Sequence, residues 1–148
     1  DATWEAYFRH AADVARYLDS ALLAGWTAHQ VALRNAVAGA RAKALGLEAS
    51  DYLVAADFSA EDDLSAVTAE WAAAPNPFVG LRILDTARWR WIAEHDAWFS
   101  FGDDELGAYA ARLMLLVRWQ RLTEAAGKTG QAPRKGPQGP GAPGRAAA

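Results

Sequence analysis

Residues 84–98 read LDTARWRWIAEHDAW, and this stretch decides the fold. Leu84, Trp91 and Trp98 recur at seven-residue steps, so they share one face of a helix. The surrounding residues 76–119 hold four of the seven tryptophans of the chain. Large aromatic rings at helical spacing are typical of core anchors, because burying them removes much apolar surface from water. We therefore predict a long helix here, with the rest of the chain wrapped around it.

A second long helix is predicted after a turn at residues 101–103. This helix, over residues 105–126, is apolar almost all round, so it is either central to the core or covered by a partner. One of its sides consists of Leu106, Leu113, Leu116 and Val117. Leu115, Trp119 and Leu122 lie on other sides, and we predict that these three residues contact a partner.

Two helices are predicted before this hairpin. Apolar residues recur at three- and four-residue steps over residues 3–23, which predicts the first helix, and Gly25 is expected to weaken or end it. Thr27 and Gln30 have the spacing of a capping box, so the second helix is predicted to begin there. Gly46 is a suitable left-handed stop for it.

Shorter helices are expected between residues 46 and 76. Ser50 and Ser59 each precede residues that suit a helix start, which predicts two short helices. Asn76 as a cap and Pro77 in the first turn predict the start of the long helix. No stretch alternates as a strand does, so we predict an all-α fold, an irregular bundle of five to six helices with a long C-terminal helical hairpin.

The last part of the chain has a different composition. Residues 127–148 contain glycine, proline and four basic residues but no acid, so we predict a disordered basic tail after a helical domain of residues 1–126. The net charge of the chain is −3, and the helical domain alone carries −7, which argues against a nucleic-acid partner. Cysteine is absent, which excludes disulfides. The first residue is Asp rather than Met, as expected of a processed or excised chain.

Several charged residues fall inside apolar helical faces. They are Arg34 and Arg41 on the second helix and Arg88 and His95 on the long helix. A buried guanidinium without a partner is very costly, so each of these cations needs an acid or another polar group. Asp85, Asp96 and Asn35 are the candidates. We predict a structural polar network of these seven residues that fixes how the helices pack, with a polar patch for a partner as the alternative.

The residues give little support for catalysis or metal binding. Glu94, His95 and Asp96 are consecutive, so on a helix their side chains point about 100° apart and cannot converge on one ion. The three histidines lie on three different predicted helices, without the spacing of metal ligands. There is no glycine-rich phosphate loop and no nucleophile elbow. We predict a protein without cofactor or metal that is not an enzyme; an enzyme using Arg34, Arg88 and His95 is the least favoured alternative.

Several short strings resemble those of a known bacterial family, in the same order. They are Ala32-Leu-Arg-Asn35, Arg41-Ala-x-x-Leu45-Gly46, Asp51-Tyr52-Leu53, Asn76-Pro77, Leu84-Asp-x-x-Arg88-Trp89, Ala108-Tyr109 and Arg118-Trp119. The family consists of uncharacterised proteins encoded beside V/A-type rotary ATPases, and is distantly similar to the C (or d) subunit, the helical socket between central shaft and membrane rotor. The resemblance spans residues 30–120, and the N-terminal part of the family is missing or very divergent in this chain.

The resemblance implies an assembly role without catalysis. The chain is then expected to be a helical subunit or accessory protein of a V/A-type ATPase, in the cytoplasm and peripheral to the membrane through its complex. Arg34, Asn35, Asp85, Arg88 and Trp89 match the motif strings, so the resemblance implies that they form its structural core. The alternative is a free-standing α-helical protein-interaction module.

Overall fold

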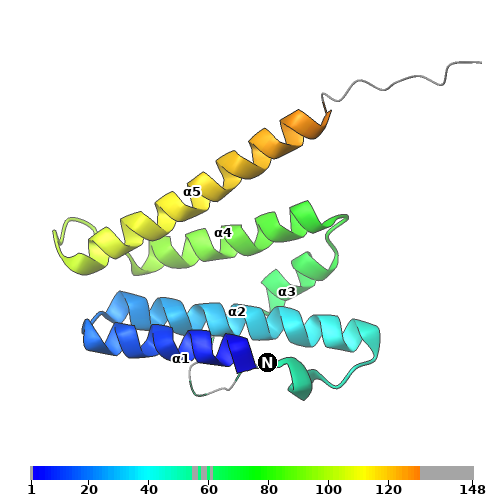
Figure 1. The fold of residues 1–148 in the computed structure, drawn as a ribbon, viewed down its shortest axis with the longest axis horizontal. Helices are drawn as coiled ribbons and strands as arrows, with labels where there is room; N and C mark the ends of the chain where they lie inside the picture. Colours follow the sequence, from blue (N-terminus) through cyan, green and yellow to red (C-terminus); the bar gives the residue numbers. More distant parts are fainter. Residues whose placement is uncertain (1, 55–56, 58–59, 61, 131–148) are drawn as a thin grey trace, which may run out of the picture. The chain divides into compact units, whose positions relative to one another are not determined.

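The computed structural model describes residues 2–54, 57, 60 and 62–130. All regular secondary structure in this part is helical, as predicted from the sequence (Figure 1). The elements are α1 (Ala2–Tyr17), α2 (Ala21–Leu45), the 3-10 helix η1 (Ala49–Tyr52), α3 (Ser65–Ala72), α4 (Pro77–His95) and α5 (Asp103–Gly130). The chain divides into two compact units, Asp1–Leu116 and Val117–Ala148. The division falls inside α5, before the boundary expected at residue 126.

The first unit is built around α2. Helix α1 and η1 pack against it, and α3 contacts both α2 and α4 (Figure 1). The core has two clusters of buried apolar side chains. One consists of Leu22, Trp91, Ile92, Ala108 and Leu115, from α2, α4 and α5, and the other of Phe8, Val31 and Val54. Residues 84–98 therefore supply the central tryptophan, Trp91, of the larger cluster.

The junction of α1 and α2 lies earlier than predicted. The first helix ends at Tyr17 and the next begins at Ala21, because Ser20 is the N-cap and its Oγ accepts a hydrogen bond from Leu23 N at 3.1 Å. Helix α2 continues through Gly25, so a helix end at this residue is wrong. A Cβ at Gly25 would lie 3.1 Å from the Trp91 ring, so glycine is needed for the close approach of α4.

Two other helix ends agree with the sequence. Gly46 has a left-handed backbone (φ 68°) and terminates α2, which confirms the predicted stop. Asn76 caps α4, since its side chain accepts a hydrogen bond from Val79 N at 2.9 Å, and Pro77 is the first helical residue. Helix α3 starts at Ser65, where Asp63 accepts from the backbone N–H; the predicted cap at residue 59 lies outside the described residues.

The α4–α5 turn is held by one carboxylate. Phe99 and Phe101 have left-handed backbones, with φ of 61° and 54°. Their N–H groups donate to Glu105, in the first turn of α5, at 3.1 and 2.7 Å. Helix α5 then runs to Gly130, past the end predicted at Ala126. The rest of the predicted tail, residues 131–148, lies outside the part of the chain that the structure describes.

Candidate functional site

Arg88 and Asp85, two residues of the predicted network, form a buried ion pair. Arg88 donates to Asp85 Oδ1 at 2.8 Å from one helical turn away, and through its Nε to Gln30 Oε1 of α2 at 2.9 Å. The Asp85 side chain is only 3% exposed and that of Arg88 is 20% exposed. The pair therefore links α4 to α2 through Gln30, a residue that the sequence had suggested only as a helix cap.

Arg34 and Asn35 are neighbours on α2, and both hydrogen-bond to the backbone of the segment that follows this helix. Arg34 donates to the carbonyl oxygen of Tyr52 at 3.0 Å, and burial lowers the pKa of its guanidinium. Asn35 makes two hydrogen bonds of 2.9 Å to Val54, donating to its carbonyl and accepting from its N–H. Val54 is buried in the core cluster of Phe8, so Asn35 supplies the partners that its backbone cannot obtain from water.

Replacing Asn35 with alanine is expected to lower the free energy of unfolding by about 2 kcal/mol, because two buried backbone groups of Val54 lose their partners. Urea denaturation measures the change. Ser50→Ala, at an exposed site of η1, is the matched control and is expected to cost under about 0.5 kcal/mol. Equal stability of the Asn35 and Ser50 variants would contradict the assignment.

The other predicted network residues have different partners. Arg41 is exposed and lies over the Trp71 ring, 5.6 Å from its centroid, so its predicted burial within an apolar helical face is wrong. His95 stacks on Trp91 at 4.0 Å and donates through Nδ1 to the Trp91 carbonyl. Asp96 pairs with Arg112 of α5, whose guanidinium also lies over Trp98. The predicted residues therefore occupy several local groups.

His29 is a buried polar residue that the sequence analysis missed. Its side chain is 4% exposed, its Nδ1 donates to Asp62 at 2.6 Å, and its ring stacks on Trp91 at 5.4 Å. Burial lowers the pKa of His29 below its ordinary value of 6.5, because the imidazolium loses hydration; Asp62 opposes this shift, and the charges of Arg88 and His95 add to it. Nothing local in the sequence marks His29, since its partner lies 33 residues away.

Stability is expected to fall as the pH decreases below 6.5. As the pH falls, the unfolded chain takes up a proton at His29 at a higher pH than the folded protein does. The stability that the neutral, buried His29 contributes is therefore complete above pH 6.5 and is lost as the pH falls through the lower folded-state pKa. The free energy of unfolding changes by at most about 1.4 kcal/mol per pH unit through this group. Urea denaturation between pH 5 and 8 measures it. His29→Phe is expected to flatten the profile, whereas His10→Gln, on the exposed face of α1, leaves it unchanged; a steep profile in His29→Phe would contradict this.

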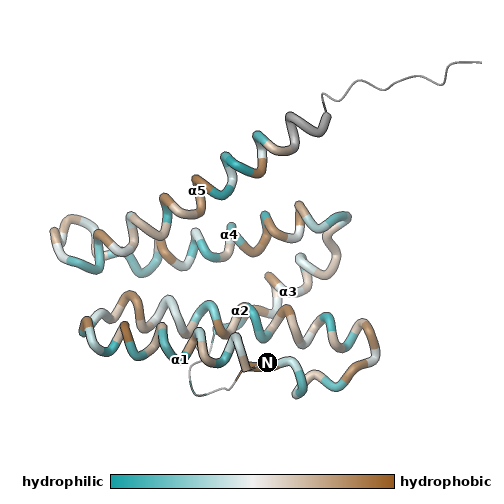
Figure 2. Tube along the Cα trace, viewed as in Figure 1, coloured by the Kyte–Doolittle hydropathy of each residue, from teal (hydrophilic) through white to brown (hydrophobic). Residues whose placement is uncertain are grey.

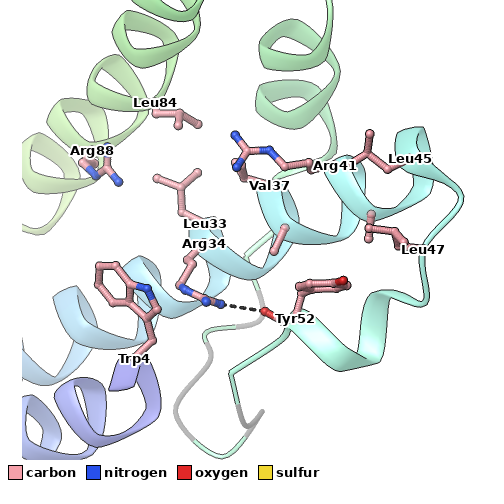
Figure 3. A pocket seen from close by; sticks show the side chains of 12 residues that line it. Trp4, Leu33, Arg34, Val37, Arg41, Leu45, Leu47, Tyr52, Leu84 and Arg88 are labelled. Carbon is pink, nitrogen blue, oxygen red and sulfur yellow. Dashed lines mark hydrogen bonds between the residues drawn. The ribbon is translucent and has the colours of Figure 1, made fainter. Parts of the chain in front are cut away.

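A groove with three arginines, here called the arginine groove, lies along α2 (Figure 3). Its volume is about 460 Å³. It is lined by Trp4, Leu33, Arg34, Val37, Ala38, Arg41, Ala42, Leu45, Leu47, Tyr52, Leu84 and Arg88. Arg34 and Tyr52 border one side, and Leu84 and Arg88 of α4 border the other (Figure 3). Three of the seven predicted network residues therefore meet at one cavity.

The apolar sides of α5 are divided between the core and solvent. In the first unit, Ala108, Ala111 and Leu115 pack into the larger core cluster. The predicted partner contact at Leu115 is therefore wrong, since this residue is 5% exposed. Trp119 and Leu122 belong to the second unit, in which both are half-buried. Helical periodicity did not distinguish these sides, because each side alone looks apolar.

An exposed apolar stripe runs along α5 on another face. It consists of Leu106, Tyr109, Leu113 and Leu116, which we call the α5 stripe. These residues recur every three or four positions, so they share one face of the helix. Their exposed fractions range from 46% to 66%. Apolar residues recur along α5 in Figure 2, and those of the stripe are exposed in the part of the chain that the structure describes.

The described residues contain no group of three His, Asp or Glu side chains placed to hold a metal ion. In the same part of the chain, every helix is too short or too polar to cross a bilayer. Scans against protein-family models, curated proteins and solved structures gave no match to this chain.

Proposed function

We propose that this chain is a non-catalytic helical subunit or accessory protein of a V/A-type rotary ATPase, in which it has a socket-like role through protein–protein contacts. The α5 stripe is the observation that carries the contact role. Four large side chains, three leucines and a tyrosine, are exposed on one face of a helix whose other face is in the core. Contiguous exposed apolar side chains of this kind mark interaction surfaces.

The motif residues support the link to the rotary ATPase family. The resemblance implies that Arg34, Asn35, Asp85 and Arg88 form a structural core. Arg34 and Asn35 hydrogen-bond to the backbone of Tyr52, the last residue of η1, and of Val54. Arg88 bonds both to Asp85 of its own helix and to Gln30 of α2. Trp89 departs from this pattern, since it is 39% exposed. Four of the five motif residues thus hold elements together, as an assembly protein with a fixed shape requires.

Co-purification tests the proposal. The tagged full-length protein is extracted gently from the membranes of the cells that make it, and its partners are quantified by mass spectrometry. Rotary ATPase subunits in a fixed ratio are expected with the unmodified protein. Leu106→Gln combined with Leu113→Gln is expected to reduce their recovery at least about tenfold, because two contacts are lost.

Tyr17→Gln is the matched control, since Tyr17 is an exposed aromatic residue of α1 outside the stripe. Its recovery of partners is expected to equal that of the unmodified protein. Recovery of other proteins through the α5 stripe would favour a free-standing interaction module. Recovery unaffected by the stripe variant would contradict the contact surface.

A further inference from the structure

The arginine groove combines three cations with apolar walls. Its lining includes Arg34, Arg41 and Arg88 and, among the residues that the structure describes, no aspartate or glutamate. Aliphatic side chains form most of the remaining surface, among them Leu33 and Leu84, which lie between Arg41 and Arg88 in Figure 3. Asp85 balances the charge of Arg88, so Arg34 and Arg41 give the groove its net positive charge, on a chain whose own net charge is −3.

Two of the three guanidinium groups are fixed in place. Arg34 is held by the Tyr52 carbonyl at 3.0 Å and lies over the Trp4 ring, 5.5 Å from its centroid. Arg88 is held by Asp85 and Gln30. Held in this way, the groups lose little further freedom when they bind an anion.

Arg41 is the available cation of the groove. It is exposed, and among the described residues no acidic side chain pairs with it; its neighbour is the Trp71 ring. The ring orients the guanidinium while leaving its N–H groups without a carboxylate. A charge so placed at the edge of an apolar cavity attracts anions and gives them a bidentate partner.

We propose that the arginine groove binds a small amphipathic carboxylate, of the chemical class of a medium-chain fatty acid. The carboxylate pairs with Arg41, and the alkyl chain lies against Leu33, Val37 and Leu84. A volume of about 460 Å³ is in the range of small-molecule sites, roughly 300–1,000 Å³. The aliphatic walls select an alkyl chain over a purely polar anion such as phosphate. This site is separate from the α5 stripe, so the proposal does not rest on a rotary ATPase partner.

Calorimetric titration with decanoate, below its micelle concentration, tests the proposal. Saturable binding of one decanoate per chain is expected, with a shift of the Trp4 indole N–H resonance in a parallel NMR titration. Decanol has the same chain without the charge and is expected to bind at least about tenfold more weakly, because it cannot form the charge-assisted bonds. No saturable binding of decanoate, or equal binding of decanol, would overturn the proposal.

Paired variants locate the site. Arg41→Gln is expected to weaken decanoate binding about tenfold while leaving the circular dichroism spectrum unchanged, because Arg41 is exposed. Arg90→Gln removes an exposed arginine of α4 that does not line the groove and is expected to bind as the unmodified protein does. An equal loss in both variants would show that only the net charge matters, and the groove assignment would fail.

Discussion

Replacing Arg88 with alanine is expected to lower the free energy of unfolding by about 3–5 kcal/mol. The reason is that the substitution leaves two polar groups without their hydrogen-bond donor. Asp85 is 3% exposed, so its carboxylate would lose its cation inside the protein, and Gln30 Oε1 would lose its donor. Breaking a buried pair by removing one partner costs more than the pair contributes, since an uncompensated charge is retained. Urea denaturation at neutral pH measures the loss.

Two further variants show whether the buried carboxylate is the cause. Arg90→Ala removes an exposed arginine of the same helix and is expected to cost under about 0.5 kcal/mol. Asp85→Leu combined with Arg88→Met removes both charges and is expected to recover much of the stability lost in Arg88→Ala. A loss below about 0.5 kcal/mol for Arg88→Ala would mean that the ion pair does not hold α4 to α2.

Replacing Trp91 with alanine is expected to cost about 3–5 kcal/mol, through lost burial and the cavity that remains. Trp91 is the largest side chain of the main core cluster. Its ring contacts Trp26 and stacks on both His29 and His95. Gly25 leaves the space in which this ring packs against α2. Thermal and urea denaturation both report the change.

Trp98 is the matched control for this substitution. It belongs to the same stretch of sequence but is 60% exposed, and its ring contacts Arg112. Trp98→Ala is expected to cost at most about 1 kcal/mol, the size of an exposed cation–π contact. If the two tryptophan variants were equally stable, Trp91 would not be the central anchor of the fold.

Much of the fold could be predicted because its signals are local. The cap at Asn76 and the stop at Gly46 depend on residues within one turn of the helix end, and both were predicted from sequence. The start of α2 could not be predicted in this way. Ser20 is a good cap, but Gly25 suggested a break, and the sequence alone does not show that Trp91 packs against Gly25 within a continuous helix.

The polar contacts were harder to predict, for a physical reason. Asp85 and Arg88 are three residues apart on one helix, so periodicity places them together. The bonds of His29 and Asn35 connect residues far apart in the chain. Such partners depend on how the helices pack against one another. The periodicity of one helical segment carries no information on that packing. The same limit applies to α5, where several sides are apolar and only packing decides which one is exposed.

Photo-crosslinking from the α5 stripe tests the proposed function most directly. A photoreactive amino acid replaces Leu113, and in a separate protein Thr86, an exposed residue of α4 outside the stripe. After illumination in the cells that make the protein, crosslinked products are identified by mass spectrometry. The proposal predicts that position 113 captures a rotary ATPase subunit and that position 86 does not. Capture of no ATPase subunit from position 113, with the tagged protein present at normal level, would contradict it.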